Sequence, residues 1–517
     1  MTWHNLTHGW NGLIFGWCLV AVPLWVGLLQ GKASMHKWLM SPVLAIVLFF
    51  AAAMVSLVLP RNGTANVILT ILCYIAIGYG GGRLAARRIS AEEYKRGTVL
   101  EEGSREQREA ERLKRQRDGV LTLAGVAVAP EDETKHFKLI GTTGTGKSTA
   151  IRELIASALE RGDRAIFADP DGGYLTRYYK PHRGDVILNP FNPDSLKWDP
   201  FAEITNPYDV EQLAGALIPI GEEGSGREWR GYARTFLTAV TRHCYQNGTR
   251  DLAELWRLLT VVPSDELRPI VAGTPAQPFL EPDSAKMFSN IRSVTGSAIA
   301  ALEYIQVQRA AAFSVREWVR SGRGALFIPY QAAQIAALRG IIAAWIRIGI
   351  FEAMSRHEGD QRLWFVVDEL DALGTIDGLK DALARLRKFG GRCVLGFQSI
   401  AQVSSTYGAG EAQTIVENCG NTLILRCSGS EGGGTSRFAS HLIGDREVIR
   451  AEVSRGRGHS TIFSGSHNDF VSESVTHRHV TEAAVLASEI EQLPDLVGFL
   501  KFASGPAWMR VAFTTRP

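Results

Sequence analysis

Cysteine is scarce in this sequence, and no cysteine stands where a zinc site or a disulfide framework would need it. Six cysteines occur among 517 residues, and none belongs to a CxxC pair or to a Cys/His cluster with zinc spacing. Small proteins that depend on disulfides have many more cysteines for their length. We therefore expect reduced cysteines used as small apolar side chains, as in a cytosolic catalytic part.

Two kinds of charge pattern are also missing. The first twelve residues contain no lysine or arginine, whereas a secretory signal peptide begins with basic residues and ends at a small-residue cleavage site. The net charge of the whole chain is only +3, and the surplus of lysine and arginine lies within residues 1–118. The rest of the chain therefore has no global basic field, and any nucleic-acid binding there must come from local basic loops.

Three uncharged apolar runs open the chain, at residues 13–29, 43–59 and 67–82. Each is slightly shorter than the roughly 20 residues that span a bilayer, and tryptophan and tyrosine side chains flank them as interfacial aromatics do. Residues 1–82 are therefore predicted to form a transmembrane anchor of three helices. The alternative is two spans, with the first run lying at the membrane surface.

The flanking cations predict the topology. Two cations separate the first two runs, one separates the second from the third, and three follow the third: Lys32, Lys37, Arg61, Arg83, Arg87 and Arg88. The positive-inside rule then places the N-terminus outside and everything after the third run in the cytoplasm. Residues 83–118, rich in charge and poor in apolar side chains, are expected to form a solvated stem or linker.

A glycine-rich loop of the form GxxxxGK[ST] occupies residues 141–148, between an apolar strand at 136–140 and an amphipathic helix. Glycines let the backbone wrap around phosphates, and the helix N-terminus attracts the anion. Lys147 is expected to bridge the β- and γ-phosphates of ATP, and the Ser148 hydroxyl to bind Mg²⁺. The expected nucleotide contacts are Gly141, Thr142, Thr143, Gly144, Thr145, Gly146, Lys147, Ser148 and Thr149.

A second apolar strand, at residues 363–367, ends in the acidic pair Asp368 and Glu369. In α/β sheets, groups at the carboxyl ends of strands face the crevice that binds ligands. Asp368 is expected to hold Mg²⁺, and Glu369 to orient and polarise the attacking water.

Other strand ends also carry polar groups. Gln398 follows a strand at 393–397, where its carboxamide is placed to contact the γ-phosphate, and Asp169 follows a strand at 165–168. A strand-end cap is the alternative interpretation of both. With further apolar segments at 325–328, 423–425 and 499–502, these strands predict an α/β fold with a mostly parallel sheet covered on both faces.

The middle of the chain follows a different pattern. Residues 206–312 show helical periodicity and no clear strand, which predicts an all-α insertion domain between two parts of a nucleotide-binding domain, at 119–205 and 313–517. The insertion offers no titratable cluster, so we expect it to make protein contacts. Residues 455–468, rich in glycine, serine and histidine, are predicted to form a loop.

The combination of motifs resembles one family. The segments GTTGTGKS, DPDGG, LNPF…WDPF, LWFVVDEL, RKFGGRCVLGFQS and LPDLVGFLKF, after a membrane anchor, are similar to those of type IV coupling proteins of bacterial conjugation, the TraD/TrwB group. This resemblance covers about residues 120–510. It implies a RecA-like P-loop ATPase that assembles as a homo-hexamer at the bacterial inner membrane, as a multi-pass protein with a cytoplasmic ATPase domain.

The resemblance also implies partners and one further site residue. Such proteins move DNA, which is expected to be single-stranded and to be bound without recognition of its base sequence, and they link a relaxase–DNA complex on a plasmid to a type IV secretion channel. Arg387 falls where the family has an arginine finger that acts on the neighbouring subunit, although a surface helix is the alternative. The N-terminus departs from the resemblance, because relatives commonly have two spans and a larger periplasmic loop.

Three other functions are alternatives to that of a coupling protein. A double-stranded DNA translocase of the FtsK kind fits less well, because the sequence has an all-helical insert and neither a long linker nor a winged-helix domain. An ABC transporter is excluded, because no LSGGQ signature precedes the acidic strand. A largely structural docking platform for the relaxosome is compatible with every residue named.

Overall fold

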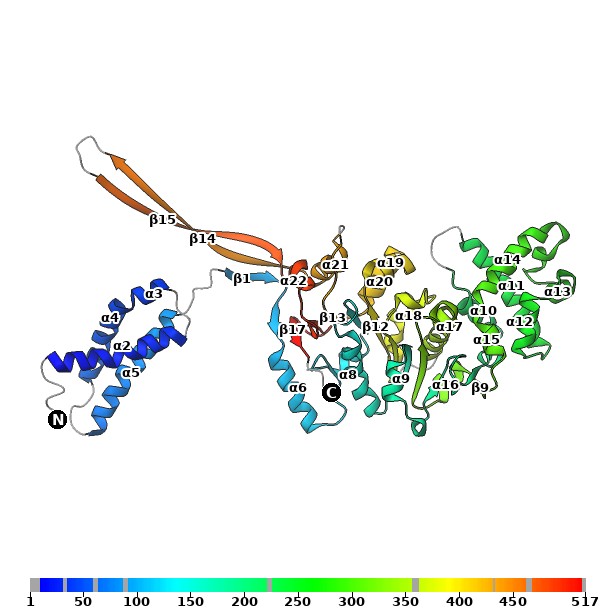
Figure 1. Ribbon diagram of the computed structural model, residues 1–517, viewed down its shortest axis with the longest axis horizontal. Helices are drawn as coiled ribbons and strands as arrows, with labels where there is room; N and C mark the ends of the chain where they lie inside the picture. The colour runs from blue at the N-terminus through cyan, green and yellow to red at the C-terminus, as the bar shows by residue number, and fades with distance from the viewer. Residues whose placement is uncertain are drawn as a thin grey trace. The chain divides into compact units, whose positions relative to one another are not determined.

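The structure is a computed structural model of the chain that describes residues 10–30, 35–58, 64–86, 92–220, 226–355, 362–430, 433–461 and 467–513. It divides into two compact units, residues 1–95 with 447–480 and residues 96–446 with 481–517 (Figure 1). Four of the cations that predict the membrane topology, Lys32, Arg61, Arg87 and Arg88, lie outside the described residues.

The first and third apolar runs fall within helices of the first unit, and so does the second run as far as Val58, its last described residue. The helices are α2 (Trp10–Gln30), α3 (Met35–Leu39), α4 (Ser41–Val58) and α5 (Thr64–Ala86). By length and composition, the segments Leu13–Gln30 of α2 and Val67–Ala85 of α5 are long and apolar enough to cross a membrane, and α4 contributes a shorter apolar segment.

Glycines allow α2 and α5 to pack backbone against backbone. A β-carbon on Gly78 would clash with the carbonyl oxygen of Val20, and one on Gly82 would clash with that of Leu24. Gly78 and Gly82 are four residues apart and therefore share one face of α5. Small residues at this spacing are the usual means of close helix packing within membranes.

A three-stranded sheet contains β1 (Glu92–Gly97), β14 (Asp445–Thr461) and β15 (His467–Ala483), in the order β1-β14-β15. The prediction of a loop at residues 455–468 is therefore wrong for the residues of this segment that the structure describes, because they lie in β14 and β15. The sequence there is poor in large apolar side chains, and a two-stranded ribbon needs no buried face to satisfy its backbone groups.

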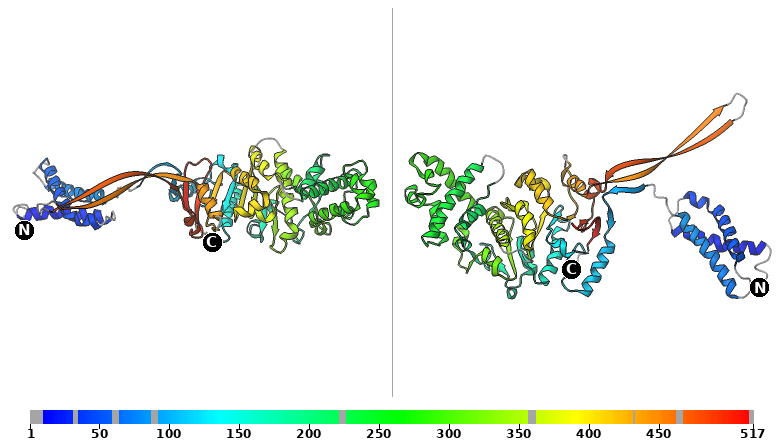
Figure 2. Two further views of the ribbon diagram at one scale, coloured as in Figure 1. Left: turned by 90° about the horizontal axis from the view of Figure 1, so that it is seen from above. Right: turned by 180° about the vertical axis from the view of Figure 1, so that it is seen from behind.

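A ten-stranded sheet forms the centre of the second unit, in the order β2-β17-β16-β13-β5-β12-β11-β6-β10-β7 (Figure 2). The pairs from β13 to β7 are parallel, while β16 pairs antiparallel with β13 and β17. The predicted mostly parallel α/β sheet is confirmed, with an antiparallel extension. The strands are β2 (Leu100–Glu102), β5 (Phe137–Ile140), β6 (Arg164–Pro170), β7 (Val186–Ile187), β10 (Ala325–Tyr330), β11 (Leu363–Val367), β12 (Gly391–Phe397), β13 (Asn421–Ile424), β16 (Val497–Lys501) and β17 (Trp508–Ala512).

Helices cover both faces of this sheet, because alternate residues of each buried strand point to opposite sides. In β11, Phe365 belongs to the apolar core on one face, while Trp364 belongs to the core on the other. The helices outside the middle of the chain are α6 (Ser104–Gln116), α7 (Pro130–Glu133), α8 (Lys147–Glu160), α9 (Gly173–Tyr178), α16 (Val315–Ser321), α17 (Ile335–Met354), α18 (Leu379–Leu386), α19 (Ile400–Tyr407), α20 (Ala409–Asn418), α21 (Gly434–Ile443) and α22 (Ala487–Glu491). Two short strands, β3 (Thr122–Leu123) and β4 (Val126–Ala127), pair with each other.

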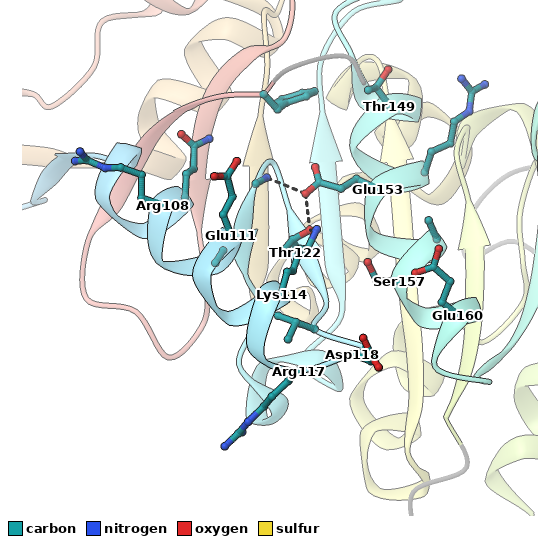
Figure 3. A pocket seen from close by; sticks show the side chains of 18 of the residues that line it. Arg108, Glu111, Lys114, Arg117, Asp118, Thr122, Thr149, Glu153, Ser157 and Glu160 are labelled. Atoms are coloured by element: carbon teal, nitrogen blue, oxygen red, sulfur yellow. Dashed lines mark hydrogen bonds between the residues drawn. The ribbon is translucent and has the colours of Figure 1, made fainter. Parts of the chain in front are cut away.

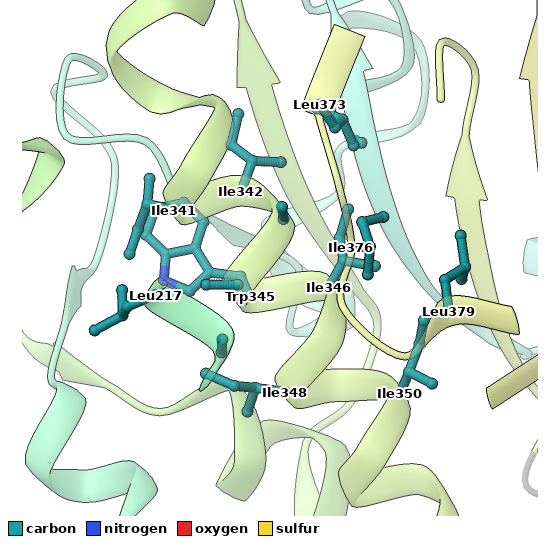
Figure 4. Close-up of a cluster of buried hydrophobic side chains, with 14 of the residues drawn as sticks. Leu217, Ile341, Ile342, Trp345, Ile346, Ile348, Ile350, Leu373, Ile376 and Leu379 are labelled. Carbon is teal, nitrogen blue, oxygen red and sulfur yellow. The ribbon is translucent and has the colours of Figure 1, made fainter. Parts of the chain in front are cut away.

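The described residues from 209 to 306 contain helices and no strand. They form α10 (Asp209–Leu217), α11 (Arg227–Gln246), α12 (Leu252–Thr260), α13 (Ser264–Val271), α14 (Ala285–Ala298) and α15 (Ala301–Gln306). This helical part begins and ends at two paired strands, β8 (Lys197–Trp198) and β9 (Ala312–Phe313). Figure 4 shows the long helix α17 packing Trp345 and its isoleucines between Leu217 of α10 and residues that follow β11.

The predicted stem at residues 83–118 differs from what the structure contains there. β2 joins one edge of the large sheet by pairing with β17, and α6 follows it with Ala110 buried. The many charged residues of α6 led to the prediction of a solvated stem. A helix can nevertheless pack against a sheet through one narrow apolar face.

Candidate nucleotide-binding site

The phosphate loop connects β5 to α8, as the sequence predicts. Gly144 and Gly146 have φ angles of 78° and 113°, a region that side chains with a β-carbon rarely adopt. A β-carbon on Gly146 would also lie 2.7 Å from the Leu496 side chain. Glycine is therefore required at these positions for this path, and α8 begins at Lys147, so the amino end of the helix lies at the loop.

Lys147 lies inside its own loop. Its ammonium donates to the carbonyl oxygens of Gly141, at 2.6 Å, and Thr142, at 3.2 Å, and only 7% of the residue is exposed. Burial lowers the pKa of Lys147, while the nearby carboxylates of Asp368 and Glu369 act in the opposite direction. These carboxylates thus help to keep a charged ammonium at the position where the loop would receive phosphate.

Ser148 and Asp368 are joined directly, although about 220 residues separate them. The Ser148 hydroxyl donates to Asp368 Oδ2 at 2.6 Å. The other oxygen, Oδ1, is buried and has no hydrogen-bond partner among the described residues. A buried unpaired carboxylate oxygen beside a serine hydroxyl is the kind of oxygen donor set that Mg²⁺ prefers, so these residues fit that ion.

Strand order explains this meeting. β5, β12 and β11 are neighbours in parallel, so the loop after β5 and the acidic pair after β11 lie at the same edge of the sheet. Gly396, near the end of β12, lets the chain after β11 come close, since a β-carbon there would clash with the carbonyl oxygen of Asp368. The Leu370 amide then donates to the Gly396 carbonyl at 2.9 Å.

Gln398 connects the acidic pair to the phosphate loop. Its Nε2 donates to Glu369 Oε1 at 2.8 Å, and its Oε1 accepts from the Thr143 hydroxyl at 2.9 Å. Burial raises the pKa of Glu369, and the hydrogen bond from Gln398 partly offsets this rise. A carboxylate with one oxygen held and a raised pKa has the properties of a general base.

Asp169 and Tyr174 contact each other, and Tyr174 also contacts Asp368. The Asp169 carboxylate accepts from the backbone amides of Tyr174, at 3.0 Å, and Leu175, at 2.7 Å, so it caps α9. Burial raises the pKa of Asp169 to about 6. The Tyr174 hydroxyl donates to Asp368 Oδ2 at 2.9 Å. Tyr174 was not predicted as a site residue, because its signal in the sequence is its position directly after DPDGG.

Arg387 lies apart from these groups. It is exposed and opens a short 3₁₀ turn (Arg387–Phe389) just before the amino end of β12, whereas Gln398 follows the carboxyl end of that strand. The seven residues of β12 span about 20 Å at roughly 3.3 Å per residue. Arg387 therefore does not reach the phosphate loop of its own chain.

A cleft of about 1050 Å³ runs along α8 and adjoins the phosphate loop at Thr149. Figure 3 shows Glu153 and Glu160 of α8 on one side of it and Glu111 and Lys114 of α6 on the other. Glu153 accepts hydrogen bonds from the Thr122 hydroxyl and the Gly125 amide, which fixes the small β3–β4 hairpin to α8. Charges of both signs line this cleft.

Comparison with known proteins gives a consistent set of relatives. The family model described as "Type IV secretion-system coupling protein DNA-binding domain" matches residues 120–514. The chain is similar to coupling protein TraD of Escherichia coli (strain K12), 29% identical over 412 residues that cover 78% of this chain and 56% of the relative. It is also similar to the type IV secretion system-coupling protein VirD4 of Bartonella henselae, 25% identical over 268 residues that cover 48% of this chain and 41% of the relative.

Solved structures of TrwB are similar over more of the chain. TrwB in complex with the ATP analogue ADPNP has a TM-score of 0.71 and 30% identity, covering 82% of this chain and 95% of that chain. TrwB in complex with ADP and Mg²⁺ gives the same values. The chain spans little more than half of the length of the curated TraD relative. The similarity to TrwB extends through both the sheet and the helical part.

Proposed function

Because the chain belongs to the type IV secretion-system coupling protein family, we propose that it is an ATPase of bacterial conjugation. It uses ATP hydrolysis to move single-stranded DNA, alone or with an attached relaxase, toward a type IV secretion channel. The observation that carries this proposal is the direct hydrogen bond between Ser148 and Asp368 at the edge of the sheet where the phosphate loop lies.

The residues of this site have distinct proposed roles. Lys147 would contact the β- and γ-phosphates of ATP, and Ser148 and Asp368 would hold Mg²⁺, which would supply positive charge to the phosphates. Support for ATP and Mg²⁺ comes from the related TrwB, whose structures include complexes with ADPNP and with ADP and Mg²⁺. The remaining contacts to the nucleotide come from the loop amides between Gly141 and Thr149.

Glu369 and Gln398 act on the reaction itself. Glu369 accepts a proton from the attacking water, since burial raises its pKa and so makes it a stronger base. Gln398 makes hydrogen bonds to Glu369 and to Thr143 of the phosphate loop. A movement of the loop at the γ-phosphate position would therefore shift Gln398, and with it the base Glu369. The same carboxamide is placed to report hydrolysis to the segment that follows it.

Arg387 completes the site from a second subunit. Arg387 lies before the amino end of β12 and so cannot contact the phosphate loop of its own chain. This supports an action on the neighbouring subunit within a ring of like subunits. A guanidinium that stabilises the transferring phosphoryl group across an interface makes hydrolysis depend on assembly. Following the family resemblance, the ring is a homo-hexamer.

The apolar helices α2, α4 and α5 form the membrane anchor of this proposal, in the bacterial inner membrane, with the second unit in the cytoplasm. Length and composition support α2 and α5 as spans, and the cations after α5 support a cytoplasmic position for the ATPase part. DNA contacts are made to the phosphate backbone without base recognition, so DNA affinity falls steeply as salt rises.

Hydrolysis measured against protein concentration tests the proposal. We expect the full chain, purified in detergent, to hydrolyse ATP at a rate per subunit that rises with concentration and with added single-stranded DNA. Lys147→Ala should abolish hydrolysis and DNA transfer while membrane insertion stays intact. A flat rate that DNA does not change would contradict the motor and favour a docking platform, and stimulation by double-stranded DNA alone would favour an FtsK-like translocase.

A further inference from the structure

The two oxygens of the Asp368 carboxylate differ in their hydrogen-bond partners. Oδ2 accepts two hydrogen bonds, from the Ser148 hydroxyl at 2.6 Å and from the Tyr174 hydroxyl at 2.9 Å. Oδ1 is buried and has no partner among the described residues. An ionised carboxylate can accept about four hydrogen bonds, so this division leaves one oxygen entirely available.

We propose that Tyr174 is a positioning residue of the metal site, whose hydroxyl holds Asp368 Oδ2 so that Oδ1 stays free for Mg²⁺. This inference rests on the proposed function. Ser148 and Asp368 would together hold Mg²⁺, so the Ser148 hydroxyl would serve both the ion and Oδ2, whereas Tyr174 serves Oδ2 alone. Without that donor, the carboxylate can rotate about its terminal torsion, which has a broad and shallow preference.

Tyr174 is itself held rigidly. The Asp169 carboxylate accepts from its backbone amide, and its ring is stacked on Phe167, with centroids 5.4 Å apart and an interplanar angle of 23°. The Arg152 guanidinium lies 5.7 Å from the ring centroid, and only 2% of Tyr174 is exposed. A side chain held by ring contacts and at its backbone can fix the orientation of the carboxylate that it touches.

The phenol keeps its proton in this environment. Burial and the neighbouring Asp368 carboxylate raise the pKa of Tyr174 well above its ordinary value. At neutral pH it is therefore a hydrogen-bond donor to Asp368. Outer groups that bond to metal ligands set the metal affinity, and losing one typically costs about 10- to 100-fold.

The chain offers a matched control on the same helix. Tyr178 also belongs to α9, and its hydroxyl donates to the backbone carbonyl of Arg152 at 3.0 Å, away from Asp368. Tyr174→Phe and Tyr178→Phe thus each remove one hydroxyl from α9. Only the first removes a donor from the carboxylate.

The test is binding of a fluorescent, non-hydrolysable ATP analogue to the detergent-purified full chain during a titration with Mg²⁺. We expect Tyr174→Phe to raise the Mg²⁺ concentration for half-maximal binding about tenfold. Analogue affinity without metal should stay unchanged, and Tyr178→Phe should behave as wild type. Electron paramagnetic resonance of Mn²⁺ on the analogue-loaded chain should show the same loss of metal affinity.

Hydrolysis gives an additional readout that separates metal binding from chemistry. At saturating Mg²⁺ the Tyr174→Phe variant should recover most of its kcat. Equal Mg²⁺ responses in the two variants would overturn the inference, and so would loss of the thermal unfolding transition in Tyr174→Phe, since the hydroxyl would then be structural. The proposed function fails separately, if the wild-type chain does not hydrolyse ATP.

Discussion

Gln398 donates a hydrogen bond of 2.8 Å to the Glu369 carboxylate, and the two side chains come from different strands of the sheet. The bond lowers the pKa of a carboxyl group that burial raises. The same carboxamide accepts from Thr143 of the phosphate loop. Base and loop are therefore connected through one residue.

Removing Gln398 should change how hydrolysis depends on pH. As pH falls through the raised pKa of Glu369, the base becomes protonated and kcat falls. Gln398→Ala removes the bond that lowers this pKa, so the acidic limb of the kcat profile should move to higher pH, and kcat at its plateau should fall about tenfold. Gln413→Ala is the control, because Gln413 makes the same 2.8 Å bond to Glu417 on the exposed side of α20. An unmoved limb in Gln398→Ala would argue against Glu369 as the base.

Arg387→Ala should be inactive alone and active in mixtures. An arginine finger contributes about 1000-fold or more to kcat, and Glu369→Gln removes the base from its own subunit. Rings that mix the two variants contain some interfaces with both groups intact, so part of the activity should return. The exposed Lys388 supplies the control, since Lys388→Ala should keep its activity. Absence of rescue at every mixing ratio would argue against action in trans.

Gly396→Ala should disturb the acidic pair from the neighbouring strand. The added β-carbon would clash with the Asp368 carbonyl oxygen, and overpacking of this kind costs about 1–3 kcal/mol. We expect a lower unfolding temperature and weaker Mg²⁺-dependent binding of ATP. Gly410→Ala is matched to it, because no heavy atom lies within 4 Å of its added β-carbon and it lies in α20. That variant should be as stable as wild type.

His136 should make the protein sensitive to acid. Its Nδ1 accepts from the Cys393 amide, so Nε2 carries the proton and donates to the Leu383 carbonyl at 2.9 Å. Burial lowers the pKa of His136 to about 4 from 6.5. The stabilising contribution of the neutral imidazole is therefore complete above about pH 6.5 and is lost progressively as pH falls from there through about 4, with a total loss of about 3 kcal/mol.

Thermal unfolding between pH 7 and pH 5 measures this contribution. His136→Gln should lower the unfolding temperature at pH 7 and flatten its decline with pH. His182→Gln, at an exposed histidine, should keep the wild-type decline. Equal declines in all three proteins would contradict a buried neutral His136.

The N-terminus should lie outside the cytoplasm. A reporter fused after Thr7 is expected to be active as a periplasmic fusion, because the cations after the third apolar run favour a cytoplasmic side. A fusion after α6 should report the cytoplasm. Cytoplasmic activity of the Thr7 fusion would leave two spans as the arrangement that fits.

Features that depend on neighbouring residues in the chain were predictable. The phosphate loop needs a strand, glycines and a helix start within about 20 residues, and a local pattern of this kind is readable without the fold. The same holds for the buried strands at 363–367 and 393–397 and for the three apolar helices. Each follows from periodicity and from the conformational freedom of glycine.

Features that depend on partners distant in the chain were not predictable. β2 and α6 look like a charged stem because their packing partners, including β17, lie about 400 residues away. Among the described residues, β14 and β15 pair with one another and with β1 alone, so no buried face marks them in the sequence.

The sequence by itself determined which residues could bind phosphate and metal, because the chemistry of a lysine, a serine and two carboxylates at strand ends is local. The tertiary structure alone decided which of them touch. Strand order brings the Ser148 hydroxyl into hydrogen-bond contact with Asp368. It also places the Tyr174 hydroxyl, whose residue follows a tight turn in the sequence, as a second donor to the same carboxylate. The physical reason is that register between strands is set by the whole sheet and not by any one strand.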